Sequence, residues 1–300
     1  MPPTVRSILG LSPTANLTTP PADPASPLGI SRAVVACCAV VGLVASGCTQ
    51  TAEGPDPNLV PERLTTTVVK THPFDPTSFT QGLELDGDRL WVSTGWHGQS
   101  GVYATSLEDP AHHGQPQARL EDKYFGEGIT QVGDTLWQLT WRQGTAFKRD
   151  AATLDVVQTA SYSGEGWGLC SFDKDDSVMV MSDGTNQLRL IDPESFVEDS
   201  RVMVQSQGQE IDKLNELDCT VEKGRRVVYA NRYLTTDIYR IDLDTGTVTA
   251  VIDASNLKSN AAPDRNNVLN GIAHIPGSDR FLLAGKRWPQ MYEVRFTSAG

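Results

Sequence analysis

The residues best suited to chemistry in this chain occupy one position of a repeated segment. Gln81, Glu127, Trp167, Asn215 and Asn270 stand at this position, at steps of 46, 40, 48 and 55 residues. A purely structural repeat would keep one residue type there, whereas this chain places a carboxylate, three amides and an indole. If the fold brings these side chains together, the carboxylate can transfer protons on a substrate that the amides and the aromatic ring hold.

The segments around these residues indicate an all-β fold. Each opens an apolar run, passes a turn rich in Gly and Asp, and returns in a second apolar run such as 90–92 or 178–181. Strand repeats of about this length are typical of propeller blades, so we predict a five-bladed β-propeller with the variable position facing a central channel. The strand-like run 64–71 lies before the first of the five repeats. We expect it to pair with 290–296 and close the ring. A short helix is expected within 254–260.

Glu127 is the candidate general acid and base. It lies between Gly126 and Gly128, which would let a ligand approach closely, and aromatic neighbours would raise its pKa. The alternative is a carboxylate that is hydrogen-bonded to the backbone of a neighbouring blade. Repeat geometry alone does not choose between the two.

A second position in each blade, at the end of the second strand, should reach the same end of the channel. Lys286 would place a charge near a developing oxyanion or be a solvated strand-end lysine. Trp141 and Trp167 would stack on a substrate or simply be buried. Gln81, Asn215 and Asn270 suit amide and ammonium recognition, but rings of side-chain oxygens also bind Ca²⁺. The complete second set is Gly95 or Trp96, Trp141, Asp183, Asn231 or Tyr233, and Lys286.

Several function classes have no support in the sequence. The five histidines and the cysteines show no zinc spacing, and neither a Gly-x-Ser-x-Gly elbow nor a phosphate-binding loop is present. The net charge of −12 argues against nucleic acid as a partner. We expect no required cofactor, with a structural Ca²⁺ in the channel as the exception.

The N-terminal part predicts export. Residues 1–47 are read as a leader whose apolar run 33–45 has the length of a signal-peptide core. The run ends Ala45-Ser-Gly-Cys48, which resembles the lipobox of bacterial lipoproteins, so Cys48 is the expected lipidation site. Residues 48–63 are expected to be a flexible tether and 64–300 one catalytic domain. We therefore expect contact with a membrane only through a lipid anchor; secretion without lipid is the alternative.

Two cysteines, Cys170 and Cys219, follow the leader region. Both lie just after the start of an innermost strand, in consecutive blades. A disulfide between neighbouring strands and two small buried thiols are equally compatible with this spacing.

The ordered motifs resemble the plant and bacterial type of glutaminyl-peptide cyclotransferase, a five-bladed propeller family. The motifs are Phe79-Thr-Gln-Gly, Tyr124-Phe-Gly-Glu-Gly, Gly166-Trp-Gly, Leu214-Asn-Glu-Leu, Leu269-Asn-Gly-Ile and Gly285-Lys-x-Trp-Pro. The resemblance implies that Glu127 is the catalytic acid and base. It also implies the pocket residues Phe79, Gln81, Phe125, Trp141, Trp167, Asn215 and Lys286. One departure is Tyr233, which stands where the family often has Trp.

The implied reaction is the cyclisation of an N-terminal glutamine to pyroglutamate with release of ammonia, and Glu127 would shuttle the proton. The expected partners are peptide or protein N-termini that begin with Gln, and the enzyme is expected to be a monomer. Two alternatives remain: a Ca²⁺-dependent propeller lactonase or esterase, and a non-catalytic propeller that binds peptides.

Overall fold

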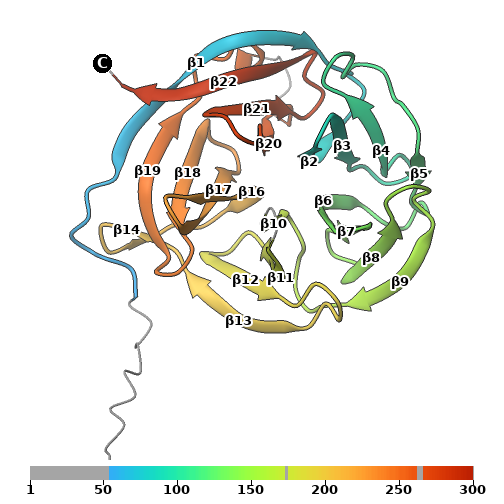
Figure 1. Ribbon diagram of the computed structural model, residues 1–300, viewed down its shortest axis with the longest axis horizontal. Coiled ribbons are helices and arrows are strands. Elements are labelled where there is room, and N and C mark those ends of the chain that lie inside the picture. The colour runs from blue at the N-terminus through green and yellow to red at the C-terminus, as the bar shows by residue number, and fades with distance from the viewer. Residues whose placement is uncertain (1–53, 173–174, 262–265, 300) are drawn as a thin grey trace, which may run out of the picture. The chain divides into compact units, whose positions relative to one another are not determined.

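The computed structural model describes residues 54–172, 175–261 and 266–299, which form an all-β unit with one 3-10 helix, η1 (Lys258–Ala261). Three separate four-stranded sheets and one larger sheet surround a common centre, as Figure 1 shows. The larger sheet contains two blades that β1 joins. The innermost strands of the five blades are β2, β6, β10, β16 and β20. The predicted five-bladed propeller is therefore confirmed. The leader 1–47 and Cys48 lie outside the described residues.

In the first four blades the strands follow the chain from the centre outward, and in the fifth blade β1 is the outer strand. Blade one comprises β2 (Thr80–Asp86), β3 (Arg89–Thr94), β4 (Gly101–Ser106) and β5 (Gln117–Arg119). Blade two comprises β6 (Gly126–Val132), β7 (Thr135–Thr140), β8 (Thr145–Asp150) and β9 (Val156–Ser161). Blade three comprises β10 (Leu169–Phe172), β11 (Asp175–Ser182), β12 (Gln187–Ile191) and β13 (Glu198–Met203). Blade four comprises β16 (Leu214–Glu222), β17 (Arg225–Arg232), β18 (Asp237–Asp242) and β19 (Thr247–Asp253). Blade five comprises β20 (Leu269–His274), β21 (Arg280–Gly285) and β22 (Gln290–Ser298), together with β1. The short strands β14 (Gln205–Ser206) and β15 (Gln209–Glu210) pair with each other, and β14 also pairs with β19.

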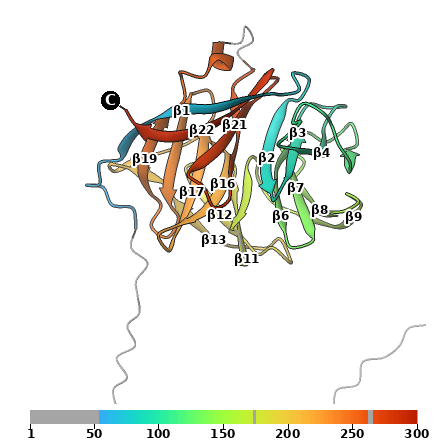
Figure 2. The same cartoon turned by 45° about the horizontal axis from the view of Figure 1, so that its top comes forward.

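The first strand closes the ring as expected. β1 (Glu62–Pro73) pairs antiparallel with β22, from Leu64 opposite Ser298 to Pro73 opposite Gln290. Its first residues also pair in parallel with β19, and Figure 1 shows β1 crossing the outer side of both blades. Pairing removes the free edge that the last blade would otherwise expose. Figure 2 shows η1 standing out beyond the strand ends, and its residues 258–260 overlap the segment predicted to be helical.

Glycines allow the innermost strands to approach one another at the crowded axis. A Cβ on Gly128 would lie 2.6 Å from the backbone of blade three, and one on Gly168 would lie 2.2 Å from Asn215 O in blade four. On the other side of Glu127, a Cβ on Gly126 would lie 2.6 Å from Thr94 O. These glycines are needed because the neighbouring backbone already fills the space of a side chain.

Bulges in the innermost strands turn the variable residues toward one end of the axis. The pairing register shifts between Thr80 and Gly82, between Gly126 and Ile129, and at the same place in blades four and five. The first residue inside each shift is the variable residue of the repeat, such as Gln81 or Glu127. Because a bulge places an extra residue on one strand, it redirects the side chain out of the regular alternation.

The apolar core lies between adjacent sheets. Blades three and four, for example, pack Val180 and Leu188 against Val228 and Ile241, all fully buried. The same interface contains a disulfide between Cys170 and Cys219, whose Cα atoms are 5.4 Å apart. The structure thus decides in favour of the disulfide over two free thiols.

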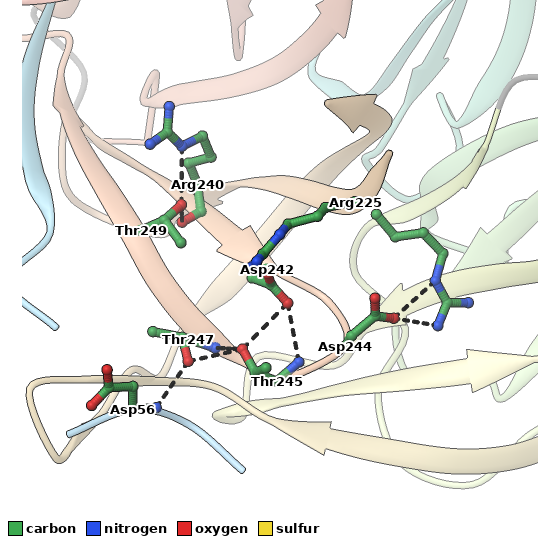
Figure 3. Close-up of polar contacts among 9 residues, drawn as sticks. Asp56, Arg225, Arg240, Asp242, Asp244, Thr245, Thr247 and Thr249 are labelled. Atoms are coloured by element: carbon green, nitrogen blue, oxygen red, sulfur yellow. Dashed lines mark hydrogen bonds and ion pairs between the residues drawn. The ribbon is translucent and has the colours of Figure 1, made fainter. Parts of the chain in front are cut away.

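The outer side of blade four also carries a set of polar contacts (Figure 3). The Asp56 N–H donates to Thr247 Oγ1 at 2.9 Å, so part of the expected tether contacts this blade. Asp242 accepts from the Thr245 N–H and closes the turn between β18 and β19. Within the described residues, no helix has the length and apolar character required to span a membrane.

Candidate active site

One cavity collects the predicted site residues where the innermost strands begin. Its volume is about 240 Å³. Residues from all five blades line it, and each of the nine predicted catalytic and pocket residues is among them. The lining consists of Phe79, Gln81, Trp96, Phe125, Glu127, Trp141, Trp167, Asn215, Tyr233, Asn266 and Lys286.

Glu127 lies at the floor of this cavity and is 4 % exposed. Its Oε1 accepts a hydrogen bond from Gln81 Nε2 at 3.0 Å, and its main-chain oxygen accepts one from Ser93 Oγ at 2.6 Å. The alternative considered for Glu127 is a carboxylate that is hydrogen-bonded to the backbone of a neighbouring blade. Glu216 has that arrangement, because its carboxylate accepts the N–H groups of Leu83 and Ile272. The Glu127 carboxylate is therefore directed at the cavity and held by a side-chain amide.

Two buried groups of opposite charge dominate the electrostatics. Burial raises the pKa of Glu127 well above its usual value; the Lys286 ammonium opposes this rise and Glu165 adds to it. Burial lowers the pKa of Lys286 to about 8, although Glu127 acts in the opposite direction. Shifts of this kind bring an acid and a base toward neutral pH, where proton transfer in both directions is efficient.

A chain of amides fixes the orientation of Gln81. Asn270 Nδ2 donates to Gln81 Oε1 at 2.8 Å and to Thr80 O at 3.1 Å. Because its oxygen is thus occupied, Gln81 presents its NH₂ group to Glu127. Asn270 itself does not line the cavity, so the expectation that all five repeat residues converge on one point is wrong for this one.

Aromatic rings enclose the cavity. The ring centroids of Phe79 and Phe125 are 6.1 Å apart, and those of Phe125 and Trp141 are 5.6 Å apart. On the other side, Trp167 and Tyr233 are 5.5 Å apart. Lys286 Nζ lies 5.0 Å from the centroid of the Phe79 ring and 5.1 Å from that of the Tyr233 ring. The ammonium therefore lies between the aromatic side chains on the two sides of the cavity.

Trp141, Tyr233 and Lys286 each stand directly after the second strand of a blade, as the repeat predicts. Two other residues of that set do not reach the cavity. Asp183 lies 3.6 Å from Arg201 in an ion pair, and Asn231 accepts the Gly271 N–H behind the wall. Local ion-pair and backbone partners therefore determine where these two point.

Glu165 joins the two indole walls, and the sequence reasoning missed it. Its Oε2 accepts the Nε1–H groups of Trp141 at 2.7 Å and Trp167 at 2.9 Å, while Oε1 accepts from Arg142 Nε at 2.8 Å. Burial alone would raise the pKa of Glu165, but these hydrogen bonds hold it below its usual value. The one available signal was its position two residues before Trp167, in Gly164-Glu165-Gly166.

Removing the Glu165 carboxylate should make the positions of the Trp141 and Trp167 side chains less fixed. Glu165→Ala leaves two indole donors without their acceptor, and we expect KM for a cavity ligand to rise roughly tenfold with a smaller change in kcat. Glu165→Gln retains a carbonyl acceptor and should recover part of the loss. Steady-state kinetics measures both values. Glu194→Ala, which removes an exposed glutamate paired with Lys148, is the control, and an unchanged KM in Glu165→Ala would contradict the assignment.

The fold and the cavity define a propeller with a buried carboxylate–amide–ammonium site inside an aromatic wall. Among the described residues, no group of three or more His, Cys, Asp or Glu side chains is placed to hold a metal ion. A model of the glutamine cyclotransferase family matches residues 39–296. The chain belongs to this family.

Two relatives extend this comparison. Glutaminyl-peptide cyclotransferase from Arabidopsis thaliana is 33 % identical over 239 residues, which cover 77 % of this chain and 71 % of the relative. The crystal structure of Myxococcus xanthus glutaminyl cyclase is 36 % identical with a TM-score of 0.72, and covers 80 % of this chain and 100 % of its own.

Proposed function

We propose that this protein is a glutaminyl-peptide cyclotransferase that converts the N-terminal glutamine of peptides and proteins to pyroglutamate and releases ammonia. Membership of the family supports the activity. The observation that carries the site assignment is the buried Glu127 carboxylate, which faces the cavity with a side-chain amide as its hydrogen-bond partner.

The proposed reaction is an intramolecular displacement. The substrate α-amine, with a pKa of about 7.7, enters the reaction in its neutral form. Its nitrogen attacks the side-chain amide carbon, a C–N bond forms, and Glu127 takes the proton that this nitrogen loses. The protonated Glu127 then gives the proton to the departing NH₂, the old C–N bond breaks, and ammonia and the lactam are released. Glu127 ends as it began.

The other residues hold the substrate in the folded conformer that cyclisation requires. Lys286 would stabilise the negative charge that develops on the amide oxygen, and Asn215 would bind the amide. The ring of aromatic side chains would enclose the reacting atoms and exclude water. Tyr233 would contribute a smaller wall than an indole, with an added hydroxyl.

We also propose an extracytoplasmic location, with Cys48 as the lipid-anchored residue and the catalytic unit acting as a monomer. The leader sequence supports export, and the Cys170–Cys219 disulfide supports an oxidising compartment.

The Ca²⁺-dependent alternative is less consistent with the charges at the floor. The Lys286 ammonium already interacts with Glu127, and a second cation at the same carboxylate would be repelled. The proposed scheme contains no step that needs a metal ion.

Ammonia release from a Gln-initiated dipeptide amide by the purified protein tests the proposal. We expect stoichiometric ammonia and pyroglutamyl product, by coupled assay and mass spectrometry, with the activity retained in EDTA. Chelator-sensitive ester hydrolysis without ammonia would replace the proposal by the lactonase alternative.

A further inference from the structure

Two side chains at the cavity mouth form a stacked pair that the proposed chemistry does not use. Trp96 lines the cavity and is 40 % exposed, an unusual state for so large an apolar side chain. The Arg287 guanidinium lies 4.6 Å from the Trp96 ring centroid and 5.2 Å from that of Phe79. Trp96 in turn packs edge-on against Phe79, with centroids 5.2 Å apart. The three residues form one platform from blades one and five.

The backbone of this platform is strained at both residues. Trp96 has φ of 95° and Arg287 has φ of 57°, in the left-handed region that bulky residues avoid. Local hydrogen bonds hold the two conformations: Trp96 O accepts from Gln99 N at 2.9 Å, and Arg287 N donates to Ser78 O at 2.8 Å. Strain that the surroundings maintain is concentrated at functional positions in proteins, which makes this pair a candidate for binding.

The Arg287 guanidinium differs from that of Arg142 in its ion pairing. Across the mouth, Arg142 is paired with Glu165 at 2.8 Å. Arg287 has no carboxylate within ion-pair distance in the described part of the chain. A guanidinium stacked on an indole keeps its N–H edge available, and that edge matches the geometry of a carboxylate.

We propose that Trp96 and Arg287 form a subsite for the residue that follows the N-terminal glutamine, and that they select an acidic side chain there. This inference rests on the proposed function. Arg287 directly follows Lys286 in the chain, and both cations flank the same Phe79 ring. Consecutive Cα atoms are about 3.8 Å apart, so a glutamine held at the floor places the next residue at the mouth.

Dipeptide amides that differ only at the second residue test this subsite. We expect the wild-type protein to have a KM for Gln-Glu-amide roughly three- to fivefold below that for Gln-Gln-amide, with similar kcat, because the contact is the same in substrate and transition state. The preference should vanish at ~1 M NaCl. In Arg287→Gln the two KM values should coincide, and Arg287→Glu should prefer Gln-Lys-amide.

A matched control separates the effect of the contact with Arg287 from the effect of the protein's overall negative charge. Arg226→Gln makes the same charge change at a half-buried arginine that pairs with Asp244, and it should keep the wild-type preference. Trp96→Leu should weaken the preference through loss of the stacking face. Circular dichroism confirms that each variant is folded.

The outcomes distinguish this inference from the activity itself. Equal KM values for all three dipeptides in the wild-type protein, or a preference for Lys, overturn the subsite and leave the cyclisation assignment standing. Absence of ammonia from every dipeptide overturns both.

Discussion

Glu127→Gln is expected to lower kcat for cyclisation by a factor of ~10³, because a positioned acid–base group contributes about 10²–10⁴ to the rate. The amide has nearly the same shape as the carboxylate, so the cavity and its hydrogen bond to Gln81 can persist while proton transfer is lost. Binding of a pyroglutamyl product analogue, measured by calorimetry, should change little. Release of ammonia at the wild-type rate would remove Glu127 from the mechanism.

Glu216 provides the matched control for this variant. It is also a fully buried glutamate of an innermost strand, and burial raises its pKa well above the usual value. Its carboxylate contacts the backbone of two blades rather than the cavity. Glu216→Gln should therefore lower thermal stability and leave kcat of the folded protein within a fewfold of wild type, which separates burial of a carboxylate from catalysis.

Lys286→Met is expected to reduce kcat/KM by roughly 10²–10³, the usual cost of losing one group that stabilises a developing oxyanion. The charge of Lys286 also lowers the pKa of Glu127. Its removal should raise that pKa further, so the acid limb of the pH–rate profile should move to higher pH. Initial rates across the pH range measure both effects.

The wild-type profile should be bell-shaped. On the acid side, Glu127 must lose its proton and the substrate amine, with a pKa of about 7.7, must be neutral, so the rate rises with pH. On the alkaline side the rate should fall as Lys286, with a pKa of about 8, loses its charge. Lys286→Arg should move the alkaline limb upward, because a guanidinium stays charged.

Lys148→Met is the control for the loss of a buried lysine. Lys148 is also largely buried and lies 5.7 Å from the Trp137 ring, away from the cavity, with Glu194 as its partner. This variant should keep both the rate and the pH profile. An Lys286→Met protein with an unshifted acid limb and full activity would contradict the oxyanion role.

Repetition made the fold predictable from the sequence. Segments of similar length with the same order of apolar runs and turns can bury their faces only against one another, which specifies blades and their number. The closing strand followed from the need to cover an edge. The same periodicity predicted that Glu127, Gln81 and Lys286 would meet, because equivalent residues of a radial array share one end of the axis.

The repeat did not predict properties that depend on the different surroundings of each blade, such as the direction of a side chain or the state of the two cysteines. Asn270 lies behind Gln81, and Asp183 turns to Arg201, because hydrogen-bond partners outside the repeat direct them. The choice between disulfide and thiols needed the 5.4 Å separation of the Cα atoms of Cys170 and Cys219. The sequence pattern contains no information on such distances across blades.

By itself, then, the sequence determined the propeller, the carboxylate at its centre and the aromatic types around it, because period and residue type are properties of the chain alone. Only the tertiary structure decided which carboxylate faces the cavity and which the backbone, how Glu165 links two indoles, and that Trp96 meets Arg287 at the mouth. Apart from the contact of Glu165 with Trp167, these contacts join residues of different blades, and bulges and packing at the axis fix their geometry.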